Sequence, residues 1–162
     1  MKRIGLIACS ASKKGKDNPE QLFKAQDIYT GRTFLLSKNV GLKKFNCDDW
    51  DILSAEHKLL DKNKEIHYYD RYLHNEPADY KHCWVQTVIE SLKAKYDLSQ
   101  DVFYIFGGND YYKDLLPYLH CYVFKFNKDR VINLDVITEY RYGKKCSSEN
   151  LTNIKKNGGI KL

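Results

Sequence analysis

Residues 4–16 read Ile-Gly-Leu-Ile-Ala-Cys-Ser-Ala-Ser-Lys-Lys-Gly-Lys, so an apolar run passes directly into a small, polar and cationic loop. Residues 4–8 have the aliphatic composition of a buried parallel strand. The polar groups of Ser10, Ser12, Lys13 and Lys14 begin where this strand would end. Because ligands of open α/β sheets bind beyond the carboxyl ends of the strands, we expect this loop to meet an anionic ligand. The alternative is an ordinary solvated connection with surface lysines.

The length and charge of the chain set broad limits on its class. It has 162 residues, with 27 Lys and Arg against 21 Asp and Glu and a formal net charge of +6. This length predicts a single domain with a sizeable core. The basic balance is compatible with nucleic acid or a phosphorylated ligand. A Lys-rich, Asn-rich and Tyr-rich composition is also typical of an AT-rich genome, so the charge does not select a partner.

The five cysteines are widely separated and include no C-x-x-C pair, and the N-terminus does not resemble a signal peptide. These features predict a cytoplasmic protein with reduced thiols. No apolar run approaches the roughly 20 residues of a membrane helix, so no membrane partner is expected. His82-Cys83 and His120-Cys121 lack a recognisable zinc spacing. We therefore predict no structural metal and no cofactor.

Apolar runs alternate with longer mixed or amphipathic segments along most of the chain. The runs predict strands at residues 4–8, 50–54, 102–106 and 121–126, and the segments predict helices at 22–44, 80–96 and 109–116. This alternation predicts a single α/β domain, with a mostly parallel open sheet of about four strands and helices on both faces. Residues 1–128 would form this core. Residues 129–162 would form a C-terminal extension, with a strand or helix and a partly mobile tail.

A second polar strand end follows residues 50–54, where Ser54 closes the strand and Glu56-His57 come next. The imidazole of His57 is suited to proton transfer near neutral pH. The alternative is that the Glu-His pair only opens the next element. Farther along, the aromatic residues of 66–73 are suited to stack on a base, with hydrogen-bonding groups beside them. Aromatics at this density also commonly pack a core.

The third polar strand end is Gly107-Gly108, where a strand is expected to turn into a helix. Glycine permits close approach of the backbone to a ligand, and the start of a helix offers unpaired N–H groups. The spacing matches neither the dinucleotide-binding fingerprint nor the Walker loop. We therefore exclude two classes of protein, the P-loop nucleoside triphosphatases and the Rossmann dehydrogenases. A purely structural Gly-Gly helix start remains the alternative.

Several short motifs occur in a recognisable order. They are Cys9-Ser10-x-x-Lys13-Lys14, Ala25-x-x-Ile28-Tyr29-x-x-x-x-Phe34, Leu53-Ser54-Ala55-x-His57-x-Leu59-Leu60, Tyr69-Asp70 and Gly108-x-x-Tyr111. The set resembles a poorly characterised bacterial and phage domain family over roughly residues 4–125. It is more distantly similar to the YaaA peroxide-stress proteins and to the core domain of archaeosine synthase. Lys14-Gly15 stands where the archaeosine synthase motif continues with Pro-Tyr, and Lys58 stands where a Gly usually precedes the paired leucines of YaaA.

This resemblance implies chemistry or binding centred on nucleobases. The leading hypothesis is an enzyme that acts on a nucleobase, a nucleoside or a modified base in nucleic acid, by base modification or N-glycosidic chemistry. The predicted catalytic residues are Ser54, His57 and Cys9, of which Cys9 would be a nucleophile if a nearby lysine lowered its pKa. The alternative for Cys9 is a small buried side chain. The predicted substrate-binding residues are Ser10, Lys13, Lys14, Tyr29, Tyr69, Asp70, Gly107, Gly108 and Tyr111.

A competing hypothesis is a non-catalytic protein of phage or stress-response type, which binds nucleic acid or sequesters a nucleotide. Its phosphate contacts would come from lysine pairs and clusters within residues 13–16, 43–44, 144–145 and 155–156. Binding to many phosphates weakens steeply as salt rises, whereas a compact nucleoside site responds little. The sequence does not predict an oligomeric state.

Overall fold

Four parallel strands form the centre of the fold, which the computed structural model describes over residues 1–126 and 132–150. They are β3 (Asp49–Ser54), β1 (Arg3–Ala8), β6 (Val102–Phe106) and β7 (His120–Phe126), in that spatial order. These strands correspond to the four apolar runs of the sequence. Their composition suits burial on both faces, because helices cover a parallel sheet from both sides.

Three antiparallel strands extend this centre. β4 (Lys58–Asp61) pairs with β3, while β8 (Ile132–Arg141) and β9 (Lys144–Asn150) follow β7. The prediction of about four mostly parallel strands is therefore wrong, because the described residues form a mixed seven-stranded sheet in the order β4-β3-β1-β6-β7-β8-β9. The β8–β9 turn has φ values of 50° at Tyr142 and 86° at Gly143. Its Tyr-Gly pair lacks the Asn or Asp that usually precedes Gly in a two-residue hairpin turn.

The C-terminal extension predicted at residues 129–162 is described only in part. Residues 132–150 form the β8–β9 hairpin and continue the central sheet. The predicted mobile tail falls on residues 151–162, which lie outside the described residues.

The predicted helix at residues 22–44 is interrupted. The segment instead contains β2 (Phe23–Lys24), α1 (Ala25–Ile28), α2 (Arg32–Leu36), a π-helical turn (Ser37–Gly41) and α3 (Leu42–Lys44). The interruption at residues 29–31 has a long-range cause. Backbone N–H groups of Lys14 and Thr30 donate to the carbonyls of Ile28 and Ser12, at 2.8 Å and 3.0 Å, and so tie this segment to the loop after β1.

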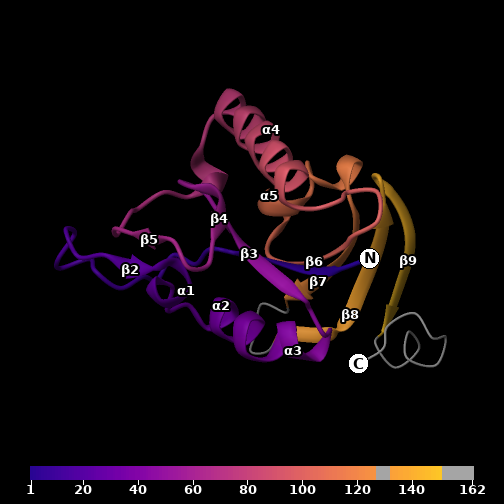
Figure 1. The fold of residues 1–162 in the computed structure, drawn as a ribbon, viewed down its shortest axis with the longest axis horizontal. Coiled ribbons are helices and arrows are strands. Elements are labelled where there is room, and N and C mark those ends of the chain that lie inside the picture. The colour runs from indigo at the N-terminus through magenta and orange to yellow at the C-terminus, as the bar shows by residue number, and fades with distance from the viewer. Residues whose placement is uncertain (127–131, 151–162) are drawn as a thin grey trace.

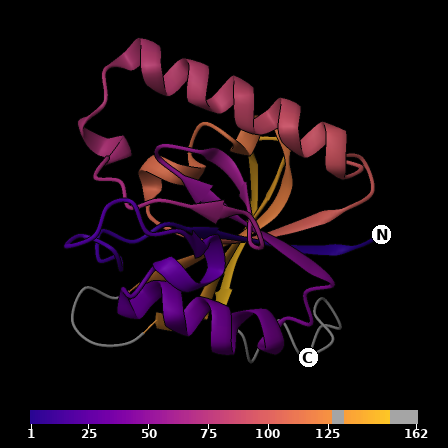
Figure 2. The same cartoon turned by 60° about the vertical axis from the view of Figure 1, so that its left-hand side comes forward.

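The other two predicted helices are present. α4 (Ala78–Lys95) matches the prediction closely, whereas α5 (Asn109–Tyr112) is shorter and is followed by a 3₁₀ turn (Leu116–Tyr118) that contains Pro117. Figure 2 shows α4 over one face of the sheet and α2 and α3 over the other. In the part of the chain that the structure describes, no helix is long and apolar enough to cross a membrane.

The core has one layer on each face of the sheet. Along β6, Tyr104 and Phe106 pack with the α1–α3 side, whereas Phe103 and Ile105 pack with the α4 side. This alternation follows the two-residue period of a strand. Because both faces are covered, loops at the ends of the strands are left to form a ligand site.

A two-stranded ribbon lies apart from the main sheet. β2 pairs antiparallel with β5 (Glu65–Ile66). Figure 1 shows this ribbon and the loop before it at the opposite end of the molecule from β8 and β9. We call the loop and the ribbon, residues 10–24 and 62–68, the arm. It stands beside the carboxyl end of β1.

The end of α4 is fixed to the sheet by a buried carboxylate. Asp51 on β3 is only 1% exposed. Its oxygens accept hydrogen bonds from Lys95 Nζ at 2.7 Å and 2.9 Å and from the Tyr96 hydroxyl at 2.7 Å. The ammonium group therefore neutralises a charge that would be costly to bury alone.

Replacing Lys95 with Ala should lower the free energy of unfolding by about 1–3 kcal/mol, because the Asp51 carboxylate would stay buried with one fewer donor and no counter-charge. Urea denaturation monitored by circular dichroism measures this. The control is Lys93→Ala on the same helix, for which we expect a change within about 0.5 kcal/mol. Equal stability of the two variants would contradict the role given to Lys95.

Candidate functional site

The topology places a site at the carboxyl end of β1. The chain runs from β1 to β3 on one side and later to β6 on the other, so β1 lies at the point where the strand order reverses. Such a switch point separates the loops that leave neighbouring strands and opens a crevice between them. A hollow of about 360 Å³ lies there, and we call it the strand-end pocket. It is lined by Ala8, Cys9, Ser10, Ala11, Ser12, Gly31, Arg32, Thr33, Phe34, Phe106, Gly107, Gly108 and Tyr111.

Five of the predicted site residues meet in this pocket: Cys9, Ser10, Gly107, Gly108 and Tyr111. The Cys9 sulfur lies 3.3 Å from the Tyr111 hydroxyl oxygen. The Ser10 hydroxyl donates to the Ser12 carbonyl at 2.7 Å and accepts from the Gly31 N–H at 3.2 Å. These contacts fix the loop after β1 against the start of α2.

Two exposed polar residues of the pocket were not predicted, namely Arg32 and Thr33. They stand at the start of α2, directly after the segment in which Tyr29 and Gly31 have extended backbone conformations. The feature of the sequence that could have indicated Arg32 is its positive charge within the motif from Tyr29 to Phe34.

A chain of hydrogen-bonded hydroxyls lies beneath the site, and we call it the tyrosine cluster. The Tyr69 hydroxyl is 2.9 Å from Ser54 Oγ and 2.8 Å from the Tyr29 hydroxyl. The His57 backbone N–H donates to Ser54 Oγ at 2.9 Å, while its ring meets the Tyr69 ring edge-on at 5.3 Å. Ser54 is 0% exposed, so its hydroxyl positions Tyr69 and His57.

Burial sets the protonation of this cluster. It raises the pKa of Tyr29 and of Tyr69 above the usual range, so both phenols stay neutral. Burial also lowers the pKa of His57, against the opposing effect of Glu56. The imidazole is therefore neutral at pH 7 and can accept a proton.

Lys13 covers the tyrosine cluster from the side of the loop. Its Nζ lies 4.4 Å from the centre of the Tyr69 ring and 5.9 Å from that of Tyr29, which is cation–π distance. Burial lowers the pKa of Lys13, while the nearby Cys9 and Asp70 oppose this effect. Lys13 is thus a half-buried amine at the junction of the thiol, the phenols and a carboxylate.

A second hollow of about 410 Å³ opens beside Lys13, and we call it the loop hollow. It is lined by Ala11, Ser12, Lys13, Lys16, Thr30, Tyr68, Asp70 and Tyr72. Ala11 and Ser12 belong to both hollows, so one short loop separates them. The predicted Asp70 and the aromatic segment 66–73 therefore meet the site here. Lys14 is exposed and is not part of either lining.

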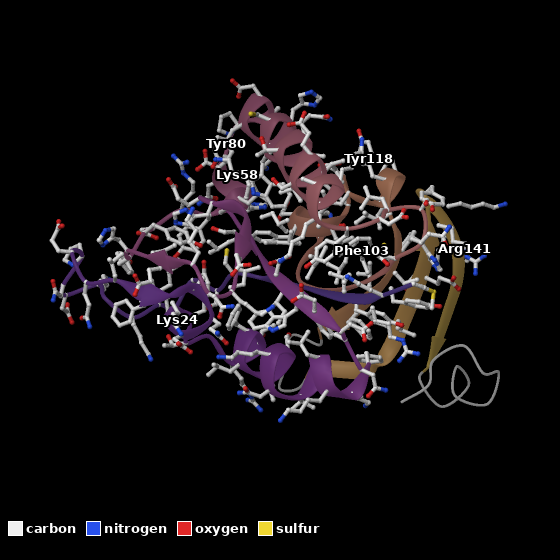
Figure 3. All side chains as sticks on the ribbon, in the orientation of Figure 1. Lys24, Lys58, Tyr80, Phe103, Tyr118 and Arg141 are labelled. Carbon is white, nitrogen blue, oxygen red and sulfur yellow. The ribbon has the colours of Figure 1, made fainter. Side chains whose placement is uncertain are left out.

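The segment that carries Tyr69 and Asp70 is held in place by Tyr80 of α4. The Tyr80 hydroxyl donates to the Ala55 carbonyl at 2.6 Å and accepts from Arg71 Nη1 at 3.0 Å. Lys58 lies 3.3 Å from the same hydroxyl, and Figure 3 shows both side chains between β4 and α4. Lys58 has a φ of 61°, so it adopts the left-handed conformation that glycine favours at this turn.

The chemical groups that line the two hollows are a thiol, hydroxyls, amines, a guanidinium and a carboxylate, whereas the imidazole of His57 lines neither hollow. Within residues 1–126 and 132–150, no three or more His, Cys, Asp or Glu side chains gather so that they could hold a metal ion. All five cysteines are free. The arrangement is suited to bind a polar ligand with an aromatic part and to act on it by nucleophilic or acid–base chemistry.

Fold and site together define a class of protein, a single α/β domain with a pocket at the switch point of its sheet. The chain belongs to the family of unknown function DUF6884, which matches residues 4–129. Both hollows lie within the matched residues. The comparisons matched no curated protein and no solved structure. The prediction of an uncharacterised domain family is thus supported, while the likeness to YaaA and to archaeosine synthase stays a prediction.

Gly107 and Gly108 provide a matched test of the pocket. A Cβ atom on Gly107 would lie 2.7 Å from the Ala8 Cβ, whereas one on Gly108 would meet nothing within 4 Å. Gly107→Ala should therefore push apart the ends of β1 and β6 and lower the free energy of unfolding by about 1–3 kcal/mol. Gly108→Ala should cost less than about 1 kcal/mol. Urea denaturation compares them, and equal losses would contradict this geometry.

The amine of Lys13 should lose its proton at lower pH than that of an ordinary lysine, whose pKa is about 10.4. Because only the neutral amine is acylated, the pH midpoint of its labelling by acetic anhydride should fall below that of Nα-acetyl-lysine in the same tube. Peptide mass spectrometry across pH 7–11 measures both midpoints. A midpoint for Lys13 at or above that of Nα-acetyl-lysine would show that burial does not lower the pKa of Lys13.

Proposed function

We propose that this protein is an enzyme that acts on a nucleobase, a nucleoside or a modified base in nucleic acid, as a hydrolase or transferase. The ligand would lie across the strand-end pocket and the loop hollow. The observation that carries the proposal is that these two hollows, of different chemistry, share the wall formed by Ala11 and Ser12. A nucleoside likewise has two joined parts of different chemistry.

The strand-end pocket suits the sugar and any phosphate. Small residues line much of it, so backbone can approach a ligand closely, and Arg32 adds a cation at its edge. The loop hollow suits the base, because Tyr68 and Tyr72 supply aromatic surface and Asp70 supplies a hydrogen-bond acceptor. The volumes of about 360 Å³ and 410 Å³ lie in the range of small-molecule sites.

Cys9 is the residue that we assign as the nucleophile. Its side chain lines the strand-end pocket, and its sulfur lies 3.3 Å from the Tyr111 hydroxyl oxygen. The neutral imidazole of His57 is our candidate for proton transfer. Ser54 acts in this proposal through Tyr69, because its hydroxyl is fully buried beneath the site.

The test is a thermal-shift screen of nucleobases, nucleosides and nucleotides, followed by mass spectrometry of each mixture for products. A true ligand should raise the melting temperature of the wild type in a concentration-dependent way. Cys9→Ser should retain this shift and lose at least about 100-fold in turnover, because the hydroxyl is a much weaker nucleophile. The matched control is Cys83→Ser on α4, where the thiol is exposed and lines neither hollow.

The outcomes separate the hypotheses. Turnover that survives in Cys9→Ser would remove the assignment of the nucleophile. A ligand that binds wild type without forming product would favour a protein that sequesters a nucleotide. If no nucleobase-containing compound shifts the melting temperature, the proposed function is wrong.

A further inference from the structure

We propose that the base recognised by this protein belongs to a single strand of nucleic acid rather than to a free nucleoside. This inference rests on the proposed function and narrows its substrate class. It follows from the walls of the loop hollow and from the arm beside it.

The loop hollow is too open to enclose a free nucleoside. Six of its eight lining residues are exposed, namely Ala11, Ser12, Lys16, Thr30, Asp70 and Tyr72. Sites for small ligands usually bury most of the ligand surface. A base in this hollow would keep one side in contact with solvent, unless neighbouring parts of a larger ligand covered it.

Tyr72 offers a stacking surface for a neighbouring base. Its side chain is 46% exposed although it stands in the wall of the loop hollow. Exposed tyrosines beside cations are typical of proteins that bind single strands, where each base stacks on an aromatic ring. In a duplex the bases are already stacked on each other and are not available to the ring, so this surface favours an unpaired strand.

Lysines continue from the loop hollow into the arm. Residues 10–24 contain four lysines, Lys13, Lys14, Lys16 and Lys24, against the two acids Asp17 and Glu20. Lys14, Lys16 and Lys24 are exposed. Figure 1 shows the arm leading away from the end of β1, so a strand that leaves the loop hollow would pass along it. The lysines would then neutralise successive phosphates.

The experiment compares the affinity of the protein for a fluorescein-labelled 12-mer of mixed sequence, as DNA and as RNA, with that for the four nucleoside monophosphates. Fluorescence anisotropy and competition at several salt concentrations give the dissociation constants. We expect at least one single strand to bind at least tenfold more tightly than any monophosphate. Tyr72→Ala should weaken binding of the strand by about 5- to 100-fold, while Tyr72→Phe should retain it. Lys16→Ala should make the salt dependence less steep.

Matched controls lie on other surfaces. Tyr142 is 53% exposed at the β8–β9 turn, and Lys113 is exposed after α5. Tyr142→Ala and Lys113→Ala should bind the strand as the wild type does. Circular dichroism of each variant checks that it is folded.

Three results would overturn the inference. One is a monophosphate that binds as tightly as every single strand, which would leave the proposed function intact. The second is equal binding, in the same assay, of the single strand and of a duplex formed from it and its complement. The third is an equal loss of strand binding in Tyr72→Ala and Tyr142→Ala. By contrast, binding of the strand through Tyr72 without formation of product would support the inference and refute the enzymatic function.

Discussion

The pairing of β1 with β3 on one side and β6 on the other is the constraint on which the site depends. All three strands are parallel, so their carboxyl ends meet at one edge of the sheet. The backbone N–H of Cys9 extends this pairing by donating to the Leu53 carbonyl at 2.9 Å. Cys9, Ser54 and Gly107 are therefore brought together by main-chain hydrogen bonds, before any side chain contributes.

The loop after β1 then separates the two hollows at this edge, because Ala11 and Ser12 line both of them. The tyrosine cluster, with Ser54 at its base and Lys13 above it, fills the space between the loop after β1 and segment 66–73. Because its phenols are buried and neutral, the cluster supports Lys13 without fixing it by an ion pair. The charges of Cys9 and Asp70 both oppose the lowering of the Lys13 pKa by burial.

The sequence predicted those parts of the fold and site that depend on local composition. The four parallel strands and α4 carry strong apolar patterns, and their polar ends identified Cys9 and Gly107 as pocket residues. The break of the helix at residues 29–31 could not be predicted, since it results from backbone bonds to residues 12–14. Arg32 was missed for the same reason. β4 was missed because it is short. β8 and β9 lie where the sequence predicted only a strand or helix, because the turn that joins them lacks the usual residues.

The central claim is that the two hollows form one binding site. An NMR titration of isotope-labelled protein with an equimolar mixture of the four ribonucleoside monophosphates tests it most directly. The account predicts that amides of residues 9–13, 31–33, 68–72 and 107–111 shift together with one dissociation constant. Lys81, His82, Val85 and Gln86 of α4 line a separate hollow of about 450 Å³, and their amides should stay unchanged. Shifts confined to that hollow, or two dissociation constants for the two parts of the site, would contradict the account.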